Sequence, residues 1–393
     1  VTSPVRRVLK YGTDYTASVS PDIDSAGKIL RITPLQPLTP STTTTHIGYV
    51  VYLSSGIKDT SGNLAEPSET YATIKAAPAG CGTITDATLK QVCQLTQAHL
   101  AIGKAVGIDP AGVLLSWSFS TQSVDTTFEW VAAAVPGVST SVRPMAITTK
   151  DVGLFGKANI YVGTTRVPYY SAVPASVNDA TILTKFWTAA GPPPAPLDQT
   201  SRWITRFNPI PAKTADATVP VLVTVPNATA AGGACSKPTA GWPVAIVEHG
   251  FTGNRLPMLR IADAFADACF VVAAIDAPMH GITDKTSPFY CPTNPLCAAA
   301  GERTFNVDFI NNATNVQTPD GQTDGSGTWF FYVGNTLFSR DNLRQAEADM
   351  IVFTKSVAAL DITGDGVGDV DPKRINYAGI SLGGIVGGVH VHF

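Results

Sequence analysis

The distribution of apolar and polar positions changes along the chain and predicts two kinds of structure. From residue 216 onward, apolar runs such as WPVAIVE and FVVAAI alternate with segments of helical period. Strands this apolar are typical of a sheet that is covered on both faces. Alternation of strands and helices is typical of parallel strands joined by crossover helices. We therefore predict an α/β domain with a parallel sheet over residues 216–393.

The helices of this region follow from apolar spacing. In MLRIADAFADAC, apolar side chains fall on one side of a helix, and RDNLRQAEADMIVFTKSVAAL gives a longer amphipathic helix. The apolar positions of the longer helix recur at steps of three and four: Leu343, Ala346, Met350, Phe353, Val357 and Leu360. The segment INYAGIS follows as a strand.

The first 78 residues have another pattern. Short β-branched and aromatic runs such as KILRITPLQPL are separated by Pro, Ser and the turn-like DTSGN. Short strands with frequent turns predict a small, Ig-like β-sandwich over residues 1–78. Its expected role is structural or adhesive.

Residues 79–215 mix both patterns and predict an α+β linking region. Within residues 83–108, apolar residues at intervals of three to five predict a helix, with Thr85 or Asp86 as its N-cap. Strands are expected at VLLSWSFSTQSV, KANIYVG and RWITRFN, and a short helix at DTTFEWVAAAV.

Composition narrows the class of protein. Apolar residues make up 44% of the 393 and charged residues 15%, which is typical of a globular chain. The net charge is −3 and no Lys/Arg run is present, so nucleic acid is not an expected partner. No apolar run reaches the roughly 18 residues of a membrane span. The chain begins at Val1 without a signal-peptide pattern, and we expect a processed or truncated start.

The six cysteines suggest disulfides. Cys81 and Cys93 flank a short segment, Cys291 and Cys297 a shorter one, and Cys235 and Cys269 remain as a third candidate pair. The alternative is six buried thiols in a cytosolic protein. The even number and the loop settings favour disulfides in an exported protein.

The segment RINYAGISLGGIVGG contains the pattern G-x-S-x-G, centred on Ser381. An apolar strand precedes this serine and a helix-compatible segment follows it. That context is typical of a nucleophilic serine on a tight strand-to-helix turn, where Gly379 and Gly383 avoid clashes. The alternative is an ordinary glycine-rich turn.

A second candidate element, VEHGFTGNR, also directly follows an apolar strand. Attack on a carbonyl by Ser381 needs two N–H groups that face the developing oxyanion. Leu382, the residue after the nucleophile, is expected to supply one, and Phe251 the other, because Gly250 lets this loop approach closely. His249 is more readily interpreted as structural than as catalytic.

A general base and its acidic partner are harder to find. In this kind of fold they follow the serine in the order Ser, Asp/Glu, His, but no Asp or Glu follows Ser381. His390 and His392 are expected on the helix that leaves the turn, about 13 and 16 Å along its axis, and are poor bases. His280, directly after a strand, is a candidate pocket residue and a less favoured base.

Two other features have competing interpretations. In DITGDGVGDVD, Asp361, Asp365 and Asp369 are spaced among glycines, as suits a calcium ion, but the Glu expected at loop position 12 is replaced by Pro372. A plain acidic turn is the alternative. Residues 281–339 contain a run of aromatic residues in GTWFFYVGNTLF. If these side chains are exposed, we expect a lid or an acyl-binding surface; the alternative is that they pack in the core.

Taken together, VEHGFTGN, AIDAPMHG, RDNLRQAEADM and YAGISLGGIVG resemble bacterial extracellular and surface lipases of the α/β-hydrolase superfamily. The earlier ITPLQPLTPSTTTTHIGYVVYLSSGIKDTSGN and LLSWSFSTQS are similar to the bacterial virulence factor lipase N-terminal region. The resemblance implies an α/β-hydrolase-like sheet and a carboxylic-ester hydrolase that acts on lipid esters or at a lipid interface. It implies secretion, or a place at the cell surface or outer membrane.

The resemblance assigns the nucleophile to Ser381 and the oxyanion donors to Phe251 and Leu382. No cofactor is required, apart from a candidate structural calcium. Such lipases continue past the nucleophile through strands that carry the acid and the His. We therefore expect a sheet that is incomplete at its C-terminal side, a fragment of a longer enzyme, and little turnover by this chain.

Two alternatives remain open. The first is a surface-binding or adhesion protein that uses residues 1–78 and carries a vestigial hydrolase half. The second is a working esterase in which His280 is the base, so that His280→Ala abolishes activity and His392→Ala does not.

Overall fold

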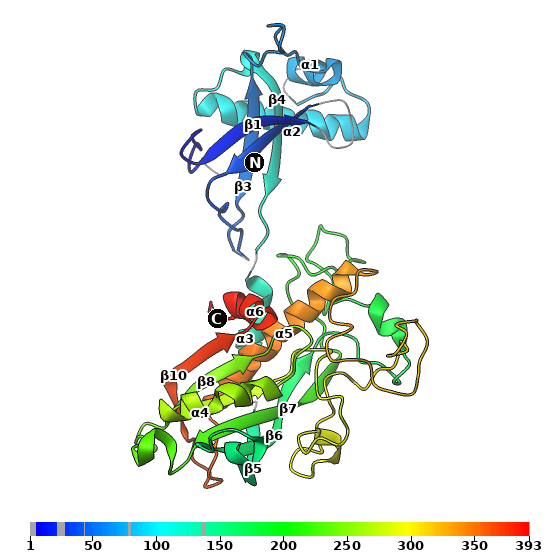
Figure 1. Cartoon of the computed structure of the whole chain (residues 1–393). Helices are drawn as coiled ribbons and strands as arrows, with labels where there is room; N and C mark the ends of the chain where they lie inside the picture. Colours follow the sequence, from blue (N-terminus) through cyan, green and yellow to red (C-terminus); the bar gives the residue numbers. More distant parts are fainter. Residues whose placement is uncertain are drawn as a thin grey trace. The chain divides into compact units, whose positions relative to one another are not determined.

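The computed structural model describes residues 5–21, 28–42, 44–77, 80–123, 125–134 and 139–392. The chain separates into two compact units, Val1–Val124 and Asp125–Phe393 (Figure 1). Each unit has its own clusters of buried apolar side chains.

Unit 1 contains two antiparallel strand pairs and two helices. Its strands are β1 (Tyr15–Pro21), β2 (Lys28–Pro34), β3 (Gly48–Ser54) and β4 (Val113–Ser120), and its helices are α1 (Glu69–Ala76) and α2 (Ala87–Ala105). Strand β1 pairs with β2, and β3 pairs with β4. Tyr71 of α1, Leu100 of α2 and Val113 of β4 form a small core. Of the two candidate caps of α2, Asp86 is the N-cap, since its carboxylate accepts the N–H of Leu89 at 2.7 Å.

The Ig-like sandwich predicted for residues 1–78 is not found in the described part of that segment. Its three strands belong to two separate two-stranded sheets, and β3 pairs with β4, which lies outside the predicted module. The module also contains helix α1. Short apolar runs identify strands but do not determine which strands pair, and this explains the error. The predicted boundary at 78/79 falls on residues outside those described.

Unit 2 is built on a six-stranded mixed sheet of order β10-β8-β9-β7-β6-β5. The strands are β5 (Thr140–Thr148), β6 (Ala158–Tyr169), β7 (Ala215–Pro226), β8 (Trp242–Glu248), β9 (Val271–Ile275) and β10 (Val370–Gly379). Strands β10, β8 and β9 are parallel, whereas β7, β6 and β5 each run antiparallel to their neighbours.

The parallel sheet predicted for residues 216–393 is therefore right for β8, β9 and β10 and wrong for β7, and the sheet also includes β5 and β6 from the predicted linking region. The connection from β5 to β6 is too short for a parallel crossover, which needs a dozen or more residues. Strands β5 and β6 also carry the sheet across the predicted boundary at 215/216. The predicted strand RWITRFN forms only an isolated bridge between Thr205 and Asn208.

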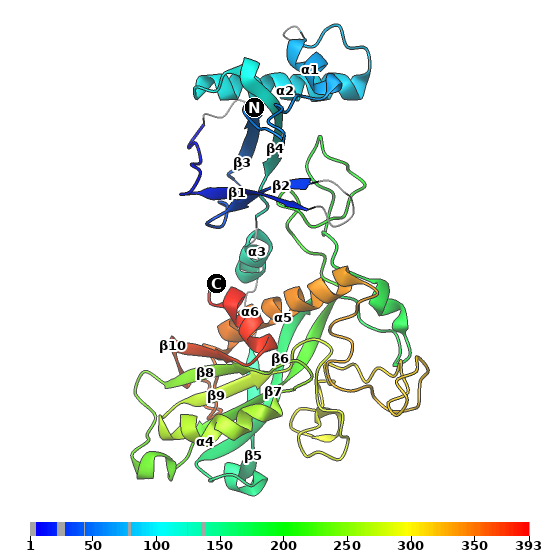
Figure 2. The same cartoon turned by 45° about the horizontal axis from the view of Figure 1, so that its top comes forward.

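Helices cover both faces of this sheet, as the apolar strands predicted. They are α3 (Thr126–Ala134), α4 (Leu259–Asp267), α5 (Thr336–Val357) and α6 (Leu382–His390). Val221 and Val223 of β7 share a core with residues of α3, α5 and α6, whereas Leu222 between them shares a core with Leu259 of α4. Alternate side chains thus face opposite layers, with α4 on one face and α5 and α6 on the other (Figure 2).

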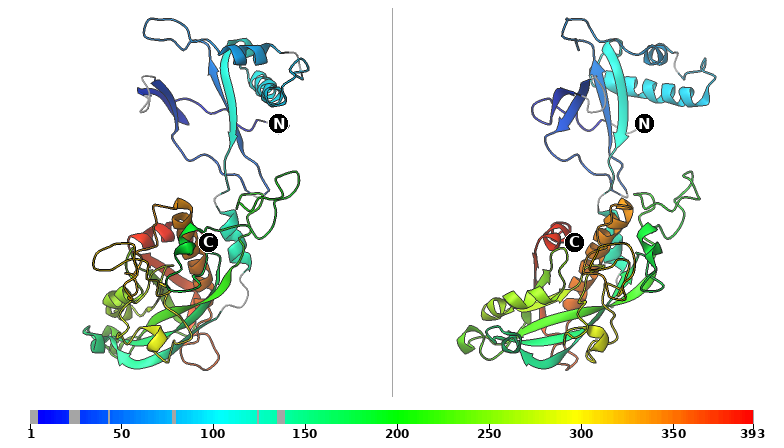
Figure 3. Two further views of the ribbon diagram at one scale, coloured as in Figure 1. Left: turned by 90° about the vertical axis from the view of Figure 1, so that its right-hand side faces the viewer. Right: turned by 45° about the vertical axis from the view of Figure 1, so that its right-hand side comes forward.

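The three candidate cysteine pairs form disulfides: Cys81–Cys93, Cys235–Cys269 and Cys291–Cys297. Short 3-10 helices also occur in the described residues, at η1 (Pro110–Gly112), η2 (Thr149–Val152), η3 (Ala180–Thr184), η4 (Ala230–Gly233), η5 (Leu256–Met258) and η6 (Cys291–Thr293). Figure 3 shows the long irregular segment between β9 and α5, which contains the Cys291–Cys297 disulfide.

A buried ion cluster anchors this irregular segment. The Arg255 guanidinium donates to both oxygens of Glu302 at 2.8 Å and pairs with Asp276. Glu302 in turn accepts the backbone N–H groups of Ile282 and Cys291 at 3.0 and 3.1 Å. The cluster ties the segment to the ends of β8 and β9.

Candidate active site

Ser381 lies on a strained turn between β10 and α6. Its backbone has φ 53° and ψ −109°, a positive φ that non-glycine residues rarely adopt, and such strain typically costs about 1–3 kcal/mol. The side chain is exposed and makes no capping hydrogen bond to α6. A serine on a strained strand-to-helix turn, with its hydroxyl accessible, is the conformation expected of a nucleophile in G-x-S-x-G.

The two glycines of the motif allow this turn to close. A Cβ on Gly379 would lie 2.3 Å from the carbonyl carbon and oxygen of Gly383. A Cβ on Gly383 would lie 2.4 Å from the backbone oxygen of Glu248. Neither position has room for a side chain, because the atoms in the way are backbone atoms.

The loop after β8 packs directly against the serine. The N–H of Ile380 donates to the Glu248 oxygen, and the N–H of Gly383 to the His249 oxygen, both at 3.1 Å. A Cβ on Gly250 would lie 3.3 Å from the Cβ of Ser381 and 3.9 Å from its Oγ. The turn that precedes Phe251 therefore lies beside the Ser381 hydroxyl.

The proposed oxyanion donors have their N–H groups free of backbone partners. Within the described residues, neither the N–H of Phe251 nor that of Leu382 donates a backbone hydrogen bond. The Leu382 side chain is buried, whereas that of Phe251 is 42% exposed. N–H groups without a backbone partner are available to an oxyanion.

His249 and His280 both have their ring nitrogens engaged. His249 places Nδ1 2.8 Å from the Gly250 oxygen, and its Nε2 accepts the Ala277 N–H at 3.1 Å. His280 places Nδ1 2.8 Å from the Pro278 oxygen, and its Nε2 accepts the Thr252 N–H at 3.3 Å. These bonds hold the loop of Phe251 and leave neither ring nitrogen free to take a proton from Ser381.

Burial keeps both rings neutral. It lowers the pKa of His249, and it lowers the pKa of His280 to about 4 with a further contribution from the neighbouring His249. The ring centroids are 4.8 Å apart. The geometry therefore gives His280 a structural part in the loop rather than the position of a base.

His390 lies at the end of α6, as predicted, and points into the protein. Its Nε2 is 3.0 Å from the Thr354 hydroxyl, and its Nδ1 is 3.5 Å from a carboxylate oxygen of Glu347. Both partners belong to α5, so this ring is directed away from the Ser381 hydroxyl. His392 follows the helix and is exposed.

The aromatic segment before α5 contains both buried and exposed rings. Phe330 is fully buried and contacts His280, with ring centroids 5.1 Å apart. Phe331 is 42% exposed and contacts Phe251 at 5.3 Å. Gly327 fits this segment to the loop, because a Cβ there would lie 2.4 Å from Nε2 of His280.

The carboxylates of the acidic loop accept hydrogen bonds from the loop's own backbone. Asp361 accepts the N–H groups of Gly364 and Gly366, and Asp369 accepts those of Ile362 and Thr363 and pairs with Lys237. The carboxylates thus face N–H donors. Among the described residues, no group of three His, Cys, Asp or Glu side chains could hold a metal ion.

Two residues of this site were missed from the sequence. Glu248 ends β8 as a fully buried carboxyl, and Tyr377 of β10 places its hydroxyl 2.5 Å from Oε2 of Glu248 and 2.6 Å from the Gly383 oxygen. The only sequence signal was an acidic residue at the end of the apolar run WPVAIVE.

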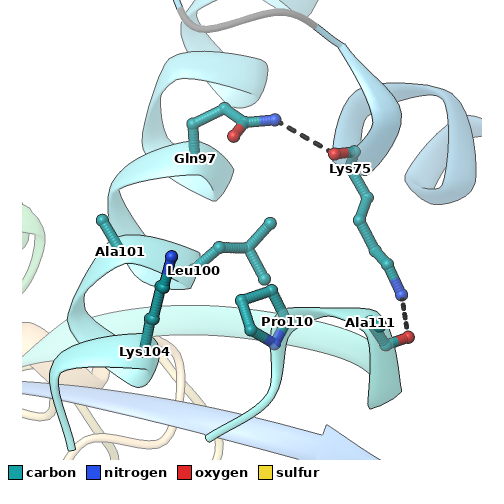
Figure 4. A pocket seen from close by; sticks show the side chains of 7 residues that line it. All are labelled: Lys75, Gln97, Leu100, Ala101, Lys104, Pro110 and Ala111. Atoms are coloured by element: carbon teal, nitrogen blue, oxygen red, sulfur yellow. Dashed lines mark hydrogen bonds between the residues drawn. The ribbon is translucent and has the colours of Figure 1, made fainter.

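A surface pocket in unit 1 is lined by residues of α1, α2 and η1 and lies apart from the Ser381 turn in the sequence (Figure 4). Its volume is about 400 Å³, and it is lined by Lys75, Gln97, Leu100, Ala101, Lys104, Pro110 and Ala111. Lys75 donates to the Ala111 oxygen at 2.7 Å, and Gln97 donates to the Lys75 oxygen at 3.2 Å. Its polar groups thus join α1, α2 and η1 and include no nucleophile.

Helices of the length and apolarity needed to cross a bilayer are absent from the described residues. A comparison with curated proteins finds no match.

Two esterases are among the solved structures with some similarity. An acetyl xylan esterase from Paenibacillus sp. R4 is 13% identical, with a TM-score of 0.31 over 68% of this chain and 54% of the esterase. A ferulic acid esterase from Streptomyces cinnamoneus is 12% identical, with a TM-score of 0.29 over 59% of this chain and 55% of the esterase. The chain thus spans about half the length of each, and these scores are too low to support a conclusion on fold or activity.

The family comparison concerns the beginning of the chain. Residues 1–148 match the model described as bacterial virulence factor lipase N-terminal. The match covers all of unit 1, together with α3 and β5 of unit 2. The beginning of this chain is therefore similar to the bacterial virulence factor lipase N-terminal family, as its sequence predicted.

Proposed function

We propose that this chain is a serine carboxylic-ester hydrolase of the lipase and esterase class, with Ser381 as its nucleophile. The observation that carries the proposal is the strained backbone of Ser381, at φ 53°, on a strand-to-helix turn beside Gly250. The match of residues 1–148 to a lipase N-terminal family supports the same class of reaction.

In the proposed reaction, the Ser381 oxygen forms a bond with the ester carbonyl carbon and gives its proton to a base. The N–H groups of Phe251 and Leu382 stabilise the tetrahedral oxyanion. The bond to the alcohol oxygen then breaks, the alcohol leaves with a proton, and water hydrolyses the acyl-enzyme. The reaction needs no cofactor.

None of the histidines described above is placed to act as the general base for Ser381. His249 and His280 have both ring nitrogens engaged, and His390 contacts Thr354 and Glu347. We therefore propose that the chain, without a further base, acylates slowly and has little turnover. Loss of the histidine base costs on the order of 10⁶-fold in kcat in a serine hydrolase.

Lipid esters are the substrates that the surroundings of Ser381 favour. Large apolar side chains are exposed on the segments that carry the site: Phe251 at 42%, Phe331 at 42%, Ile380 at 57% and Ile385 at 62%. Such side chains suit an acyl chain or a lipid interface. The three disulfides support an extracellular or cell-surface location, because disulfides persist in oxidising compartments.

The test is covalent labelling of the full chain with a fluorophosphonate, followed by mass spectrometry of the modified peptide. We expect slow modification of Ser381, its loss in Ser381→Ala, and its retention in Ser176→Ala, a change of an exposed serine of the same unit. Modification of another residue, or none in a sample that is folded by circular dichroism, would refute the nucleophile.

Turnover of a short-chain chromogenic ester tests the second part. We expect a rate close to that of Ser381→Ala. Fast, Ser381-dependent turnover would refute the proposed lack of a base, and His280→Ala would then show whether His280 supplies it.

A further inference from the structure

The hydroxyl of Tyr377 lies within hydrogen-bond distance of two oxygen atoms. It is 2.5 Å from Oε2 of Glu248 and 2.6 Å from the backbone oxygen of Gly383. Both distances are those of short hydrogen bonds between oxygen atoms. A tyrosine hydroxyl has a single hydrogen and can donate only once.

Counting protons assigns the second hydrogen to Glu248. The Gly383 carbonyl can only accept, so the Tyr377 hydrogen is directed to it. The remaining short contact then needs a hydrogen on the carboxyl group. The chain of donors runs from Glu248 Oε2–H to the Tyr377 oxygen, and from Tyr377 O–H to the Gly383 oxygen.

The surroundings of Glu248 favour this neutral form. Its side chain is fully buried, and its Oε1 has no hydrogen-bond partner among the described residues. An unpaired carboxylate in such a place is strongly disfavoured. Burial raises the pKa of Glu248 to about 8, the hydrogen bond from Tyr377 opposes this, and the carboxyls of Glu347 and Asp349 raise it further.

Other titratable groups pack around the pair from several elements. They are His249 after β8, Glu347 and Asp349 on α5, His390 on α6, and Arg303, which pairs with Asp349 at 2.6 Å. Arg303 is the permanent cation of this set and is directed to Asp349. It therefore does not provide a partner for an ionised Glu248.

Glu248 and Tyr377 act on the backbone that holds Ser381. The Gly383 carbonyl belongs to the first turn of α6, two residues after Ser381, and accepts the Tyr377 hydroxyl. The backbone oxygen of Glu248 accepts the N–H of Ile380, on the other side of Ser381. The same residue thus restrains the turn before and after the serine.

We infer that Glu248 is held as a neutral carboxylic acid which, through Tyr377, positions the Ser381 turn, and that ionisation of Glu248 loosens that turn. Glu248 is a positioning residue in this scheme, because it reaches Ser381 only through other groups. The inference rests on the proposed role of Ser381 as nucleophile for its link to catalysis. The protonation of Glu248 stands independently of that role.

The rate of Ser381 labelling by a fluorophosphonate tests the positioning. Glu248→Gln keeps a donor toward Tyr377 and cannot ionise, so we expect labelling at the wild-type rate well below pH 8. Well above pH 8, the labelling rate of wild type should be about 5-fold lower than that of Glu248→Gln, as expected for the loss of one hydrogen bond. Tyr377→Phe should be about 5-fold slow at both pH values. Equal pH profiles for wild type and Glu248→Gln would overturn the positioning role.

Infrared spectroscopy tests the protonation without any activity. Below pH 8, wild type should show the carbonyl band of a protonated carboxylic acid that is missing in Glu248→Gln and disappears at higher pH. Identical spectra in that region would overturn the inference. A band that behaves as expected, together with no labelling of Ser381, would support a neutral Glu248 and refute the nucleophile, so the two failures are distinguishable.

Discussion

Unit 2 contains two buried clusters of charged groups that differ in how well they are satisfied. The Arg255 cluster pairs one guanidinium with Asp276 and Glu302, and none of their side-chain atoms is among the buried polar atoms that lack a partner. In the cluster behind Ser381, Arg303 pairs with Asp349 and His390 with Glu347, but Oε1 of Glu248 and Oε2 of Glu347 have no hydrogen-bond partner among the described residues.

The difference separates a cluster that fixes structure from one that can respond to pH. A fully paired network in a low-dielectric interior is rigid. In the second cluster, Glu248 makes no ion pair among the described residues, and its Oε1 has no hydrogen-bond partner. Burial raises the pKa of Glu248, Glu347 and Asp349.

Removal of the central cation should break the first cluster most severely. In Arg255→Met, Asp276 and Glu302 lose their buried partner, and we expect a loss of about 3–5 kcal/mol in the free energy of unfolding. Urea unfolding measures it. Arg303→Met is the matched change in the second cluster and should cost about 1–2 kcal/mol, because Asp349, whose pKa is raised by burial, can take up a proton when its partner is removed. Equal losses would contradict the comparison.

The second-largest expected effect is a dependence of the free energy of unfolding on pH that comes from Glu248 in the second cluster. The folded-state pKa of Glu248 is raised from 4.5 to about 8, so the folded protein holds a proton that the unfolded chain has lost. Its contribution is fully present below pH 4.5 and is lost as the pH rises to about 8. The slope is up to about 1.4 kcal/mol per pH unit.

Urea unfolding of Glu248→Gln across the same range isolates this term. We expect the free energy of unfolding of wild type to fall relative to the variant as the pH rises through this window. The lowered pKa of His249 and His280 acts in the opposite direction but is shared by both proteins, so it cancels. A constant difference would show that Glu248 does not titrate there.

The smallest effect is expected at the edge of the second cluster. Thr354→Val removes the hydroxyl that contacts Nε2 of His390 at 3.0 Å while it keeps the shape of the side chain. We expect a loss of about 1 kcal/mol in the free energy of unfolding. A double-mutant cycle with His390→Gln assigns that loss to the pair, and additive single changes would contradict it.

The sequence was most informative where local chemistry decides the structure. Gly379 and Gly383 around Ser381 predicted the strained turn, because backbone atoms leave no room for side chains there. The cysteine spacing gave all three disulfides. Asp86, one of the two predicted candidates, is the N-cap of α2. Such caps can be predicted because they depend on residues that are close together in the sequence.

Long-range arrangements could not be predicted in the same way. An apolar strand such as β7 has the same composition whether it runs parallel or antiparallel, so the mixed sheet was missed. The contact of Glu248 with Tyr377 joins residues 129 positions apart. The sequence around Glu248 or Tyr377 does not predict this contact; the one signal is an acidic residue at the end of an apolar run.

Gly327 has a consequence for how freely the segment between β9 and α5 can change. Its φ of 76° and its fit against His280 and the N–H of Thr252 make it a point of close contact between that segment and the loop of Phe251. Almost any side chain at this position would displace the loop, so a single glycine limits how the segment can change.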